Sequence, residues 1–175
     1  MNTPQYNVLS NHSWKVVYVS SRSEKKVSER LRETGIENYV PIKREKRKWS
    51  DRMKWVELPL INGYVFVRPS STQRDSVLQH PGVISYVRYN GSDAVIRESE
   101  IAALRSIEQK GYFVELLPKQ ELASGQKVLI QHGPFVGLQG YVHSKLNEQM
   151  YTIDIEGIGY ALKVRVPDEI IQKLS

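Results

Sequence analysis

The chain has no cysteine, and this absence excludes disulfides, zinc sites built on thiolates and cysteine nucleophiles. It also lacks any apolar run close to the roughly 20 residues that a membrane-spanning helix needs. The polar stretch 1–13 has no apolar segment of the kind found in a signal peptide. We therefore expect a cytoplasmic protein that makes no membrane contact and is stabilised by packed apolar cores.

Histidine and glycine occur in patterns that support no reaction centre. The four histidines, His12, His80, His132 and His143, are scattered, and no pair has the spacing of a helical metal motif. The segment 133–140 is rich in glycine but lacks the Gly-Lys-Ser/Thr ending of a phosphate-binding loop. The sequence predicts no catalytic residue, no metal and no cofactor.

Positive charge is concentrated in the first part of the chain. Residues 1–110 contain 19 Lys and Arg against 12 Asp and Glu, whereas residues 111–175 contain 6 against 7. The segment 43–54 alone carries seven cations and two carboxylates, with two tryptophans in or beside it. Such local asymmetry favours contact with nucleic acid or with an acidic protein.

The first part of the chain has the pattern of an α+β unit. Runs of β-branched and aromatic residues predict strands at 14–19, 36–42, 64–68 and 83–89. Apolar spacing and helix-end signals predict helices at 24–34 and 72–79 and around Ile101, Leu104 and Ile107. The basic segment predicts a hairpin that turns at Trp49-Ser50-Asp51-Arg52 and returns to Leu58.

The second part of the chain has the pattern of a small β-barrel. Periodicity weakens over 110–120, which we interpret as a linker between two domains. Short alternating segments separated by glycine then predict a barrel of about five strands within 121–175. Pro167-Asp168 is expected to begin a final helical turn that contains Ile170, Ile171 and Leu174.

Two sets of motifs, taken in order, resemble the NusG family of transcription elongation factors. The first set is Trp14-Lys15-Val16-Val17-Tyr18 and Asn62-Gly63-Tyr64-Val65-Phe66-Val67, and the second is Gly125, Gly133-Pro134-Phe135 and Gly140. Glycines at fixed offsets in a β context mark positions where a tight turn or a close backbone approach excludes a Cβ atom.

This resemblance implies two domains. After a flexible N-terminus at 1–13, residues 14–109 are expected to form an NGN-like mixed α/β sandwich. Beyond the linker, 121–175 would form a five-stranded, SH3-like KOW β-barrel.

The resemblance also implies an apolar patch that grips the β′ clamp of RNA polymerase, with the β gate loop as a second candidate contact. By position, this patch is Tyr18, Ile61, Tyr64 and Phe66. Tyr64 and Phe66 lie two residues apart on one predicted strand, so they project from the same face, and we favour the interface for both. Val65 and Val67 on the opposite face are expected to be core.

The basic hairpin is the candidate for contact with upstream or nontemplate DNA, since cations neutralise phosphates while aromatic rings stack on bases. A passive solvated surface is the alternative. The hairpin candidates are Lys43, Arg44, Lys46, Arg47, Lys48, Trp49, Arg52 and Lys54. Sequence-specific reading, as in operon-specific relatives, would instead use residues on the first helix and nearby loops, for which the candidates are Arg22, Lys25, Lys26, Arg74 and His80.

Departures from the family pattern point to a specialised paralogue. Asn62 stands where the family commonly has proline. The barrel positions that relatives use to contact Rho or a ribosomal protein carry different side chains here, and the predicted partner surface is Phe135, Leu138, Ile158 and Tyr160.

The sequence is most similar to paralogues of the UpxY and RfaH types. The implied function is a monomeric elongation and antitermination factor that suppresses pausing or termination, with capsular polysaccharide operons as the candidate targets. A ribosome- or RNA-binding KOW protein is the alternative, but that reading expects positive charge on the barrel, and residues 111–175 are near neutral.

Overall fold

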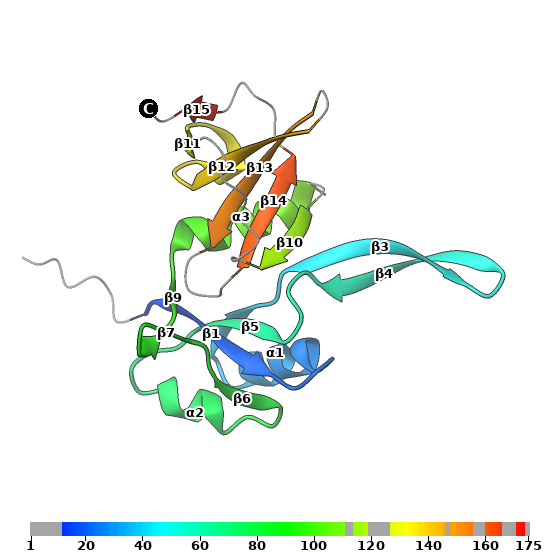
Figure 1. Cartoon of the computed structure of the whole chain (residues 1–175). Coiled ribbons are helices and arrows are strands. Elements are labelled where there is room, and N and C mark those ends of the chain that lie inside the picture. Colours follow the sequence, from blue (N-terminus) through cyan, green and yellow to red (C-terminus); the bar gives the residue numbers. More distant parts are fainter. Residues whose placement is uncertain are drawn as a thin grey trace, which may run out of the picture.

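The computed structural model describes residues 12–110, 114–118, 127–145, 148–155, 160–165 and 171–173, and Figure 1 shows the arrangement of their helices and strands. Side chains are described for the whole of the first range and, within the third, for 128–133 and 135–141. Among the described residues, no helix is long and apolar enough to span a membrane.

An antiparallel sheet forms the centre of the N-terminal part. Strands β2, β5, β1 and β6 lie in that order, and β9 pairs with the start of β1. Their bounds are Trp14–Val19 (β1), Glu37–Tyr39 (β2), Tyr64–Arg68 (β5), Val83–Tyr86 (β6) and Val95–Ile96 (β9). The predictions at 14–19 and 64–68 are confirmed to the residue, because these segments combine β-branched residues with clear punctuation.

The two faces of this sheet bury separate apolar clusters. On one face, Val17 and Val65 pack with side chains of α1 (Glu24–Glu33) and α2 (Arg74–Leu78). On the other, Trp14 and Phe66 share a cluster with side chains of α3 (Glu98–Lys110). The alternation of side chains along each strand produces this division, and it confirms Val65 and Val67 as core residues.

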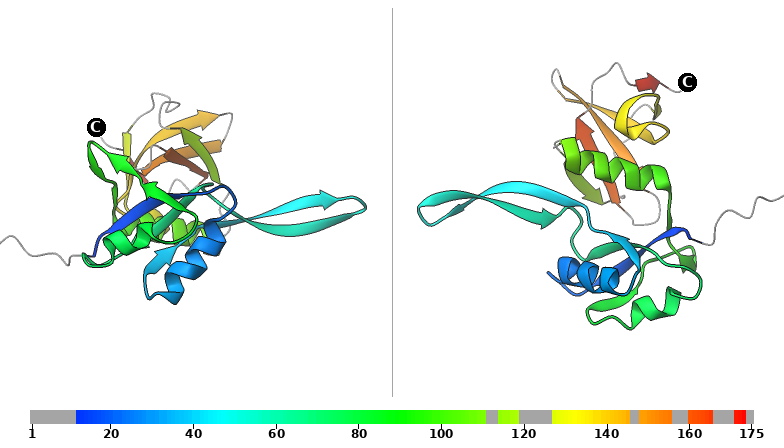
Figure 2. Two further views of the ribbon diagram at one scale, coloured as in Figure 1. Left: turned by 90° about the horizontal axis from the view of Figure 1, so that it is seen from below. Right: turned by 180° about the vertical axis from the view of Figure 1, so that it is seen from behind.

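Two hairpins lie outside the central sheet. The larger one joins β3 (Ile42–Trp49) to β4 (Arg52–Pro59), and it stands clear of the rest of the protein in Figures 1 and 2. The smaller one joins β7 (Arg88–Tyr89) to β8 (Ser92–Asp93). The predicted turn at Ser50-Asp51 is confirmed, and Ser50 there has a positive φ of 43°.

The described part of the C-terminal region is an antiparallel sheet in the order β10-β14-β13-β12-β11-β15. The strands are Val114–Pro118 (β10), Lys127–Ile130 (β11), Gln139–Lys145 (β12), Glu148–Ile155 (β13), Tyr160–Arg165 (β14) and Ile171–Lys173 (β15), with a 3₁₀ turn at Gly133–Phe135 (η2).

Two predictions are wrong in this region. β10 falls within the segment interpreted as a linker, because Val114 to Pro118 pair with β14 far along the chain. Residues 171–173 form β15 rather than a helical turn, because they pair with β11. In both places a partner strand distant in sequence overrides the local pattern.

Helix α3 connects the two parts of the structure. Its inward side chains, including Leu104 and Ile107, belong to the same buried cluster as Phe135 and Leu138 of the C-terminal region. η2 lies directly against α3, and Figure 2 shows the helix running along the C-terminal sheet. A single apolar cluster therefore extends from the N-terminal sheet through α3 to η2.

Candidate functional site

Tyr18 and Tyr64 form an aromatic pair at one end of the central sheet. They are register partners on β1 and β5, and their rings meet edge to face with centroids 5.4 Å apart and an interplanar angle of 78°. Such a pair adds about 0.5–1.5 kcal/mol beyond the area it buries. Tyr18 remains 45% exposed and Tyr64 is half-buried, so the pair presents an ordered aromatic surface.

A tight turn before β5 positions this pair. Gly63 has φ of +80°, and a Cβ atom there would lie 3.2 Å from Cε2 of Tyr18. Its backbone N–H donates a hydrogen bond of 2.7 Å to Oε1 of Glu24, a carboxylate buried in the first turn of α1. The turn thus provides both the space for the Tyr18 ring and a fixed start for β5.

The other two residues predicted for this patch, Ile61 and Phe66, are buried in the structure. Their exposed fractions are 1% and 0%, and both belong to the cluster that contains side chains of α3. The expectation that Phe66 lies at a surface is therefore not met here, although it does share a face with Tyr64. The cause is that α3 and its neighbours cover most of the face from which Tyr64 and Phe66 project.

The cations of the β3–β4 hairpin fall into two groups, those that pair with a carboxylate and those that do not. Lys43, near the root, and Arg47, in the distal half, both pair with Glu45, and Arg44, near the root, pairs with Glu57. Hydrogen bonds from Lys43 and Arg47 hold the pKa of Glu45 below its ordinary value. These three cations are partly neutralised, because they share two carboxylates.

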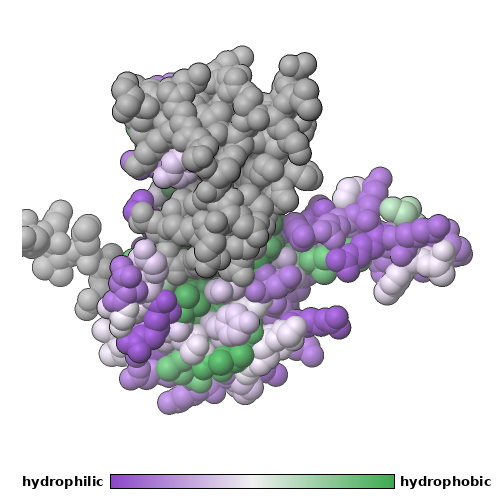
Figure 3. Space-filling model, viewed as in Figure 1, coloured by the Kyte–Doolittle hydropathy of each residue, from purple (hydrophilic) through white to green (hydrophobic). Residues whose placement is uncertain are grey.

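Four other cations of the hairpin, all in its distal half, have no carboxylate partner among the described residues. These cations are Lys46, Lys48, Arg52 and Lys54. Their side chains lie on exposed strands, and Figure 3 shows the hairpin as a mostly hydrophilic arm with a few paler and apolar side chains on it. The unneutralised positive charge of the hairpin is therefore concentrated in its distal half.

Two exposed tryptophans accompany these cations. Trp49 is 63% exposed and lies under Nζ of Lys54 at 5.3 Å, while Trp55 is 61% exposed and lies under Nζ of Lys46 at 5.0 Å. Each contact orients a ring, and an exposed cation–π pair of this kind stabilises by about 0.5–1 kcal/mol. The sequence-based set of candidates includes Trp49 and omits Trp55, which the register places directly opposite Lys46.

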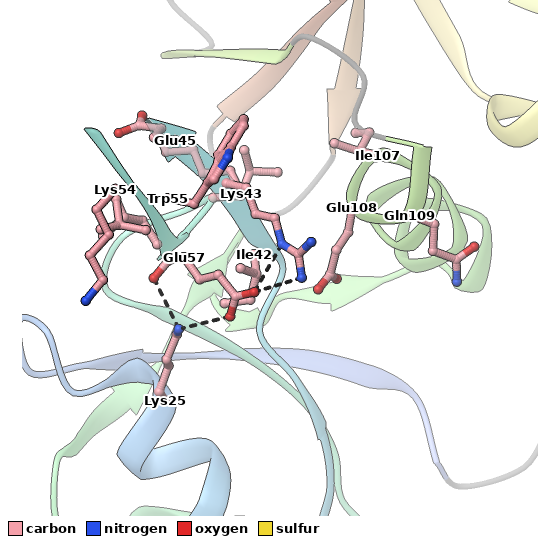
Figure 4. Close-up of a pocket in the computed structure, with 14 residues that line it drawn as sticks. Lys25, Ile42, Lys43, Glu45, Lys54, Trp55, Glu57, Ile107, Glu108 and Gln109 are labelled. Carbon is pink, nitrogen blue, oxygen red and sulfur yellow. Dashed lines mark hydrogen bonds and ion pairs between the residues drawn. The ribbon is translucent and has the colours of Figure 1, made fainter. Parts of the chain in front are cut away.

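The root of the hairpin borders a cleft of about 1470 Å³ between the hairpin, α1 and the end of α3. Lys25 donates a hydrogen bond of 3.1 Å to the backbone carbonyl of Glu57, and the Glu57 carboxylate accepts from Arg44 (Figure 4). Lys25 therefore ties the hairpin root to α1, and Arg44 bridges the two strands of the hairpin, so both cations already have a partner.

The remaining nucleic-acid candidates are not gathered with the hairpin tip. Nε of Arg74 is 2.9 Å from Oδ2 of Asp93, and its guanidinium also pairs with Asp75, so both carboxylates raise the pKa of Arg74. His80 has Nδ1 at 2.9 Å from the carbonyl of Ser76, and its Nε2 also has a hydrogen-bond partner, the hydroxyl of Thr34. Figure 1 places α2 and the hairpin on different parts of the molecule.

Arg22 and Lys26 are exposed, in the turn before α1 and on α1 itself. Arg22 has a positive φ of 61°. α1 lies near the root of the hairpin rather than its tip (Figure 1). The structure thus brings the hairpin candidates together and distributes the others over separate surfaces.

The predicted partner surface of the C-terminal region is only partly described. Phe135 and Leu138 are 0% and 3% exposed, within the cluster shared with α3, so the chain itself covers both. Ile158 lies outside the described residues, and Tyr160 is described only as the first residue of β14. Between Phe135 and Leu138, Val136 is an apolar side chain that is exposed, at 53%.

A model of a protein family described as transcription termination factor nusG matches residues 12–105. The match spans more than half of the chain and contains every element that positions the Tyr18–Tyr64 pair and the hairpin. The chain belongs to the NusG family. Members of this family are transcription factors rather than enzymes, so a general role in transcription elongation or antitermination follows.

One solved structure agrees with this assignment at the level of fold. A structure from Thermotoga maritima, described as domain interaction in NusG, matches with a TM-score of 0.55 and 20% identity, covering 94% of this chain and 98% of that one. A complex of MjSpt4 and Spt5 matches with a TM-score of 0.31 and 18% identity, covering 93% and 98%. No curated protein sequence gives a significant match.

Proposed function

We propose that this NusG-family protein is a specialised elongation and antitermination factor that binds the clamp of RNA polymerase through a surface centred on Tyr18 and Tyr64. The observation that carries this proposal is the ordered aromatic pair of exposed Tyr18 and half-buried Tyr64, held by the Gly63 turn and the buried Glu24. An aromatic surface that is rigid before binding loses little conformational entropy on association.

The proposed mechanism requires no chemical step. A protein that bridges the polymerase clamp and the opposite side of the DNA cleft disfavours clamp opening, and with it the paused state. Such a protein shifts the equilibrium only by its difference in affinity for the two states, and about 1.4 kcal/mol is enough to change pausing tenfold.

Further assignments belong to the same proposal. The distal hairpin would contact DNA, and the C-terminal sheet would be part of a KOW-type barrel that recruits a second partner such as Rho or a ribosomal protein. The dense charge of the hairpin supports a specialised role, for which capsular polysaccharide operons are the candidate targets.

Retention of core RNA polymerase by the tagged chain tests the proposal. We expect the wild type to retain polymerase and a Tyr18→Ala/Tyr64→Ala variant to lose at least tenfold in affinity, because both rings leave the contact surface. Phe66→Ala is unsuitable, since removal of a fully buried phenylalanine costs about 3–5 kcal/mol of stability.

A matched control is Tyr89→Ala, which removes a tyrosine of similar exposure, 52%, from the separate β7–β8 hairpin. Tyr18→Ala alone provides a second variant that removes less buried area. Circular dichroism of each variant checks folding. Equal retention by the wild type and the folded double variant would contradict the proposed surface. Retention of ribosomes rather than polymerase would support the RNA-binding alternative.

A further inference from the structure

The distal half of the β3–β4 hairpin has an unusual distribution of side chains, because its two faces carry the same chemistry. Register pairs place Lys46 opposite Trp55 and Lys48 opposite Met53 on one face. On the other face, Lys54 pairs with Arg47, and Trp49 pairs with Arg52. Successive residues of a strand alternate between faces, so the two tryptophans point in opposite directions.

Each face therefore has one exposed tryptophan, one lysine that lies over its ring, and further positive charge. The Trp55 face has Lys46 and Lys48 without a carboxylate partner, and the Trp49 face has Arg52 and Lys54 in the same condition, among the described residues. Neither face belongs to either buried cluster. An ordinary surface hairpin packs one face on the protein, and this one packs neither.

A ligand that runs along one face of the hairpin would leave the other tryptophan and its cations without a role. A single nucleic-acid strand is such a ligand. A groove with phosphates on both walls uses both faces at once. The net positive charge on each face is complementary to two negatively charged walls, one on either side of the hairpin.

The thickness of the hairpin matches the width of one kind of nucleic-acid groove. Stacked sheets pack about 10 Å apart, so a two-stranded ribbon with side chains on both faces is about 10 Å thick. The major groove of B-form DNA is about 12 Å wide and admits a two-stranded ribbon, whereas the minor groove is about 6 Å wide. The major groove of A-form RNA is too deep and narrow for side chains to enter.

The reach of the hairpin is also sufficient. Each strand of the hairpin has eight residues, and at about 3.3 Å per residue the hairpin is about 26 Å long. Figures 1 and 2 show that it projects from the rest of the protein without a covering element in any of the three views. The tip can enter a groove about 8.5 Å deep without a clash from the domain behind it.

We infer that the distal β3–β4 hairpin inserts tip-first into the major groove of duplex DNA, with its two faces against the two phosphate walls. This inference deepens the DNA contact of the proposed function and rests on it. Trp49 and Trp55 lie beneath Lys54 and Lys46 and hold these cations toward opposite walls. The partner is thus a double helix on the side of the protein where the hairpin projects.

Two variants with equal loss of charge test the inference. Lys46→Gln/Lys48→Gln removes the unpaired cations of one face, and Arg52→Gln/Lys54→Gln removes those of the other. Arg32→Gln/Lys110→Gln is the control, because it removes two exposed cations from α1 and α3. Fluorescence anisotropy with a 20-base-pair DNA duplex, its single strand and a duplex RNA of the same sequence gives affinity over a range of salt concentrations.

The wild type is expected to prefer the DNA duplex over both other probes. Each face variant should reduce the slope of log affinity against log salt by about 1.8, since each loses two phosphate contacts at about 0.9 per contact. The control should keep the wild-type slope. Circular dichroism and polymerase retention are measured for each variant, so that loss of folding is separated from loss of binding.

Three results would overturn the inference. A change in slope for only one face variant would mean that the hairpin lies flat on its ligand. If the wild type binds the single strand or the RNA duplex as tightly as the DNA duplex, or more tightly, insertion into the DNA groove is excluded. A wild-type chain that retains polymerase but binds no DNA would remove this inference and leave the clamp contact standing, whereas failure to retain polymerase is a failure of the proposed function itself.

Discussion

Gly63 is the residue on which the aromatic pair most directly depends. Two features of this position require glycine. Its φ is +80°, and the Tyr18 ring lies 3.2 Å from where a Cβ atom would be. We expect Gly63→Ala to cost about 1–2 kcal/mol from the left-handed backbone, with a further loss because the ring must move. Urea unfolding measures the total, and polymerase retention reports the position of the ring.

Gly35 offers a control for this substitution. It has a similar φ of +74°, but a Cβ atom there meets nothing within 4 Å. Gly35→Ala should therefore show the backbone cost alone and leave polymerase retention unchanged. If the two variants lose the same stability and retain polymerase equally, contact with Tyr18 has no effect.

At the scale of elements, Asp93 ties three parts of the N-terminal domain together. Its carboxylate, at the end of β8, accepts from Arg74 at the start of α2 and from Lys15 on β1. Burial alone would raise its pKa, but the hydrogen bonds and charges of Arg74 and Lys15 outweigh burial and lower it. The ionised form is therefore favoured in the folded state.

This shift predicts a loss of stability in acid. A carboxylate whose pKa is lowered by folding stabilises the protein above its unfolded value, about 3.9, and that contribution disappears as the pH falls through the folded value. We expect Asp93→Asn to be less stable than wild type at pH 6 and to lose less stability between pH 6 and pH 3. Urea unfolding at both values checks this.

Asp75→Asn provides the comparison, because Asp75 also pairs with Arg74 but its side chain is 83% exposed. Little change is expected from it, since exposed ion pairs contribute about 0–1 kcal/mol. If the stability of wild type and of Asp93→Asn falls by the same amount between pH 6 and pH 3, Asp93 is not a source of acid sensitivity.

Elements with a strong local signal could be predicted from the sequence. Strands 14–19 and 64–68, the first helix and the turn of the basic hairpin follow from alternation, apolar spacing and turn residues. β10 and β15 could not, because each is short and is defined by a partner strand far along the chain. The pattern of residues within a short segment does not show which distant strand that segment pairs with.

The candidate site was predictable to a similar extent. Alternation correctly puts Phe66 on the same side of β5 as Tyr64, but it cannot reveal which element covers that side. Glu24 gives only the ordinary signal of an acidic residue in the first turn of a helix. Its hydrogen bond to Gly63, 39 residues away, depends on the tertiary fold.

At the scale of the whole molecule, α3 couples the N-terminal sheet to the C-terminal region through one apolar cluster. Phe135 is fully buried in that cluster. We expect Phe135→Ala to lower stability by about 3–5 kcal/mol and to separate the unfolding of the two parts. Differential scanning calorimetry should show one main transition in wild type and two in the variant.

Val136→Ala is the control for this experiment, because the neighbouring side chain is 53% exposed. It should leave a single transition near the wild-type temperature, since exposed substitutions usually change stability by less than about 0.5 kcal/mol. Two transitions already present in wild type would contradict the coupling.

The independence of the β3–β4 hairpin from both buried clusters has an evolutionary consequence. Residues 42–59 contribute no side chain to either cluster, so selection for stability imposes little constraint on them. Mutations in the arm can accumulate without unfolding the domain, and arms of different length or composition can be exchanged on the same sheet. A lineage of such proteins can therefore vary this one segment, and with it the proposed DNA contact, while the rest of the chain keeps its sequence.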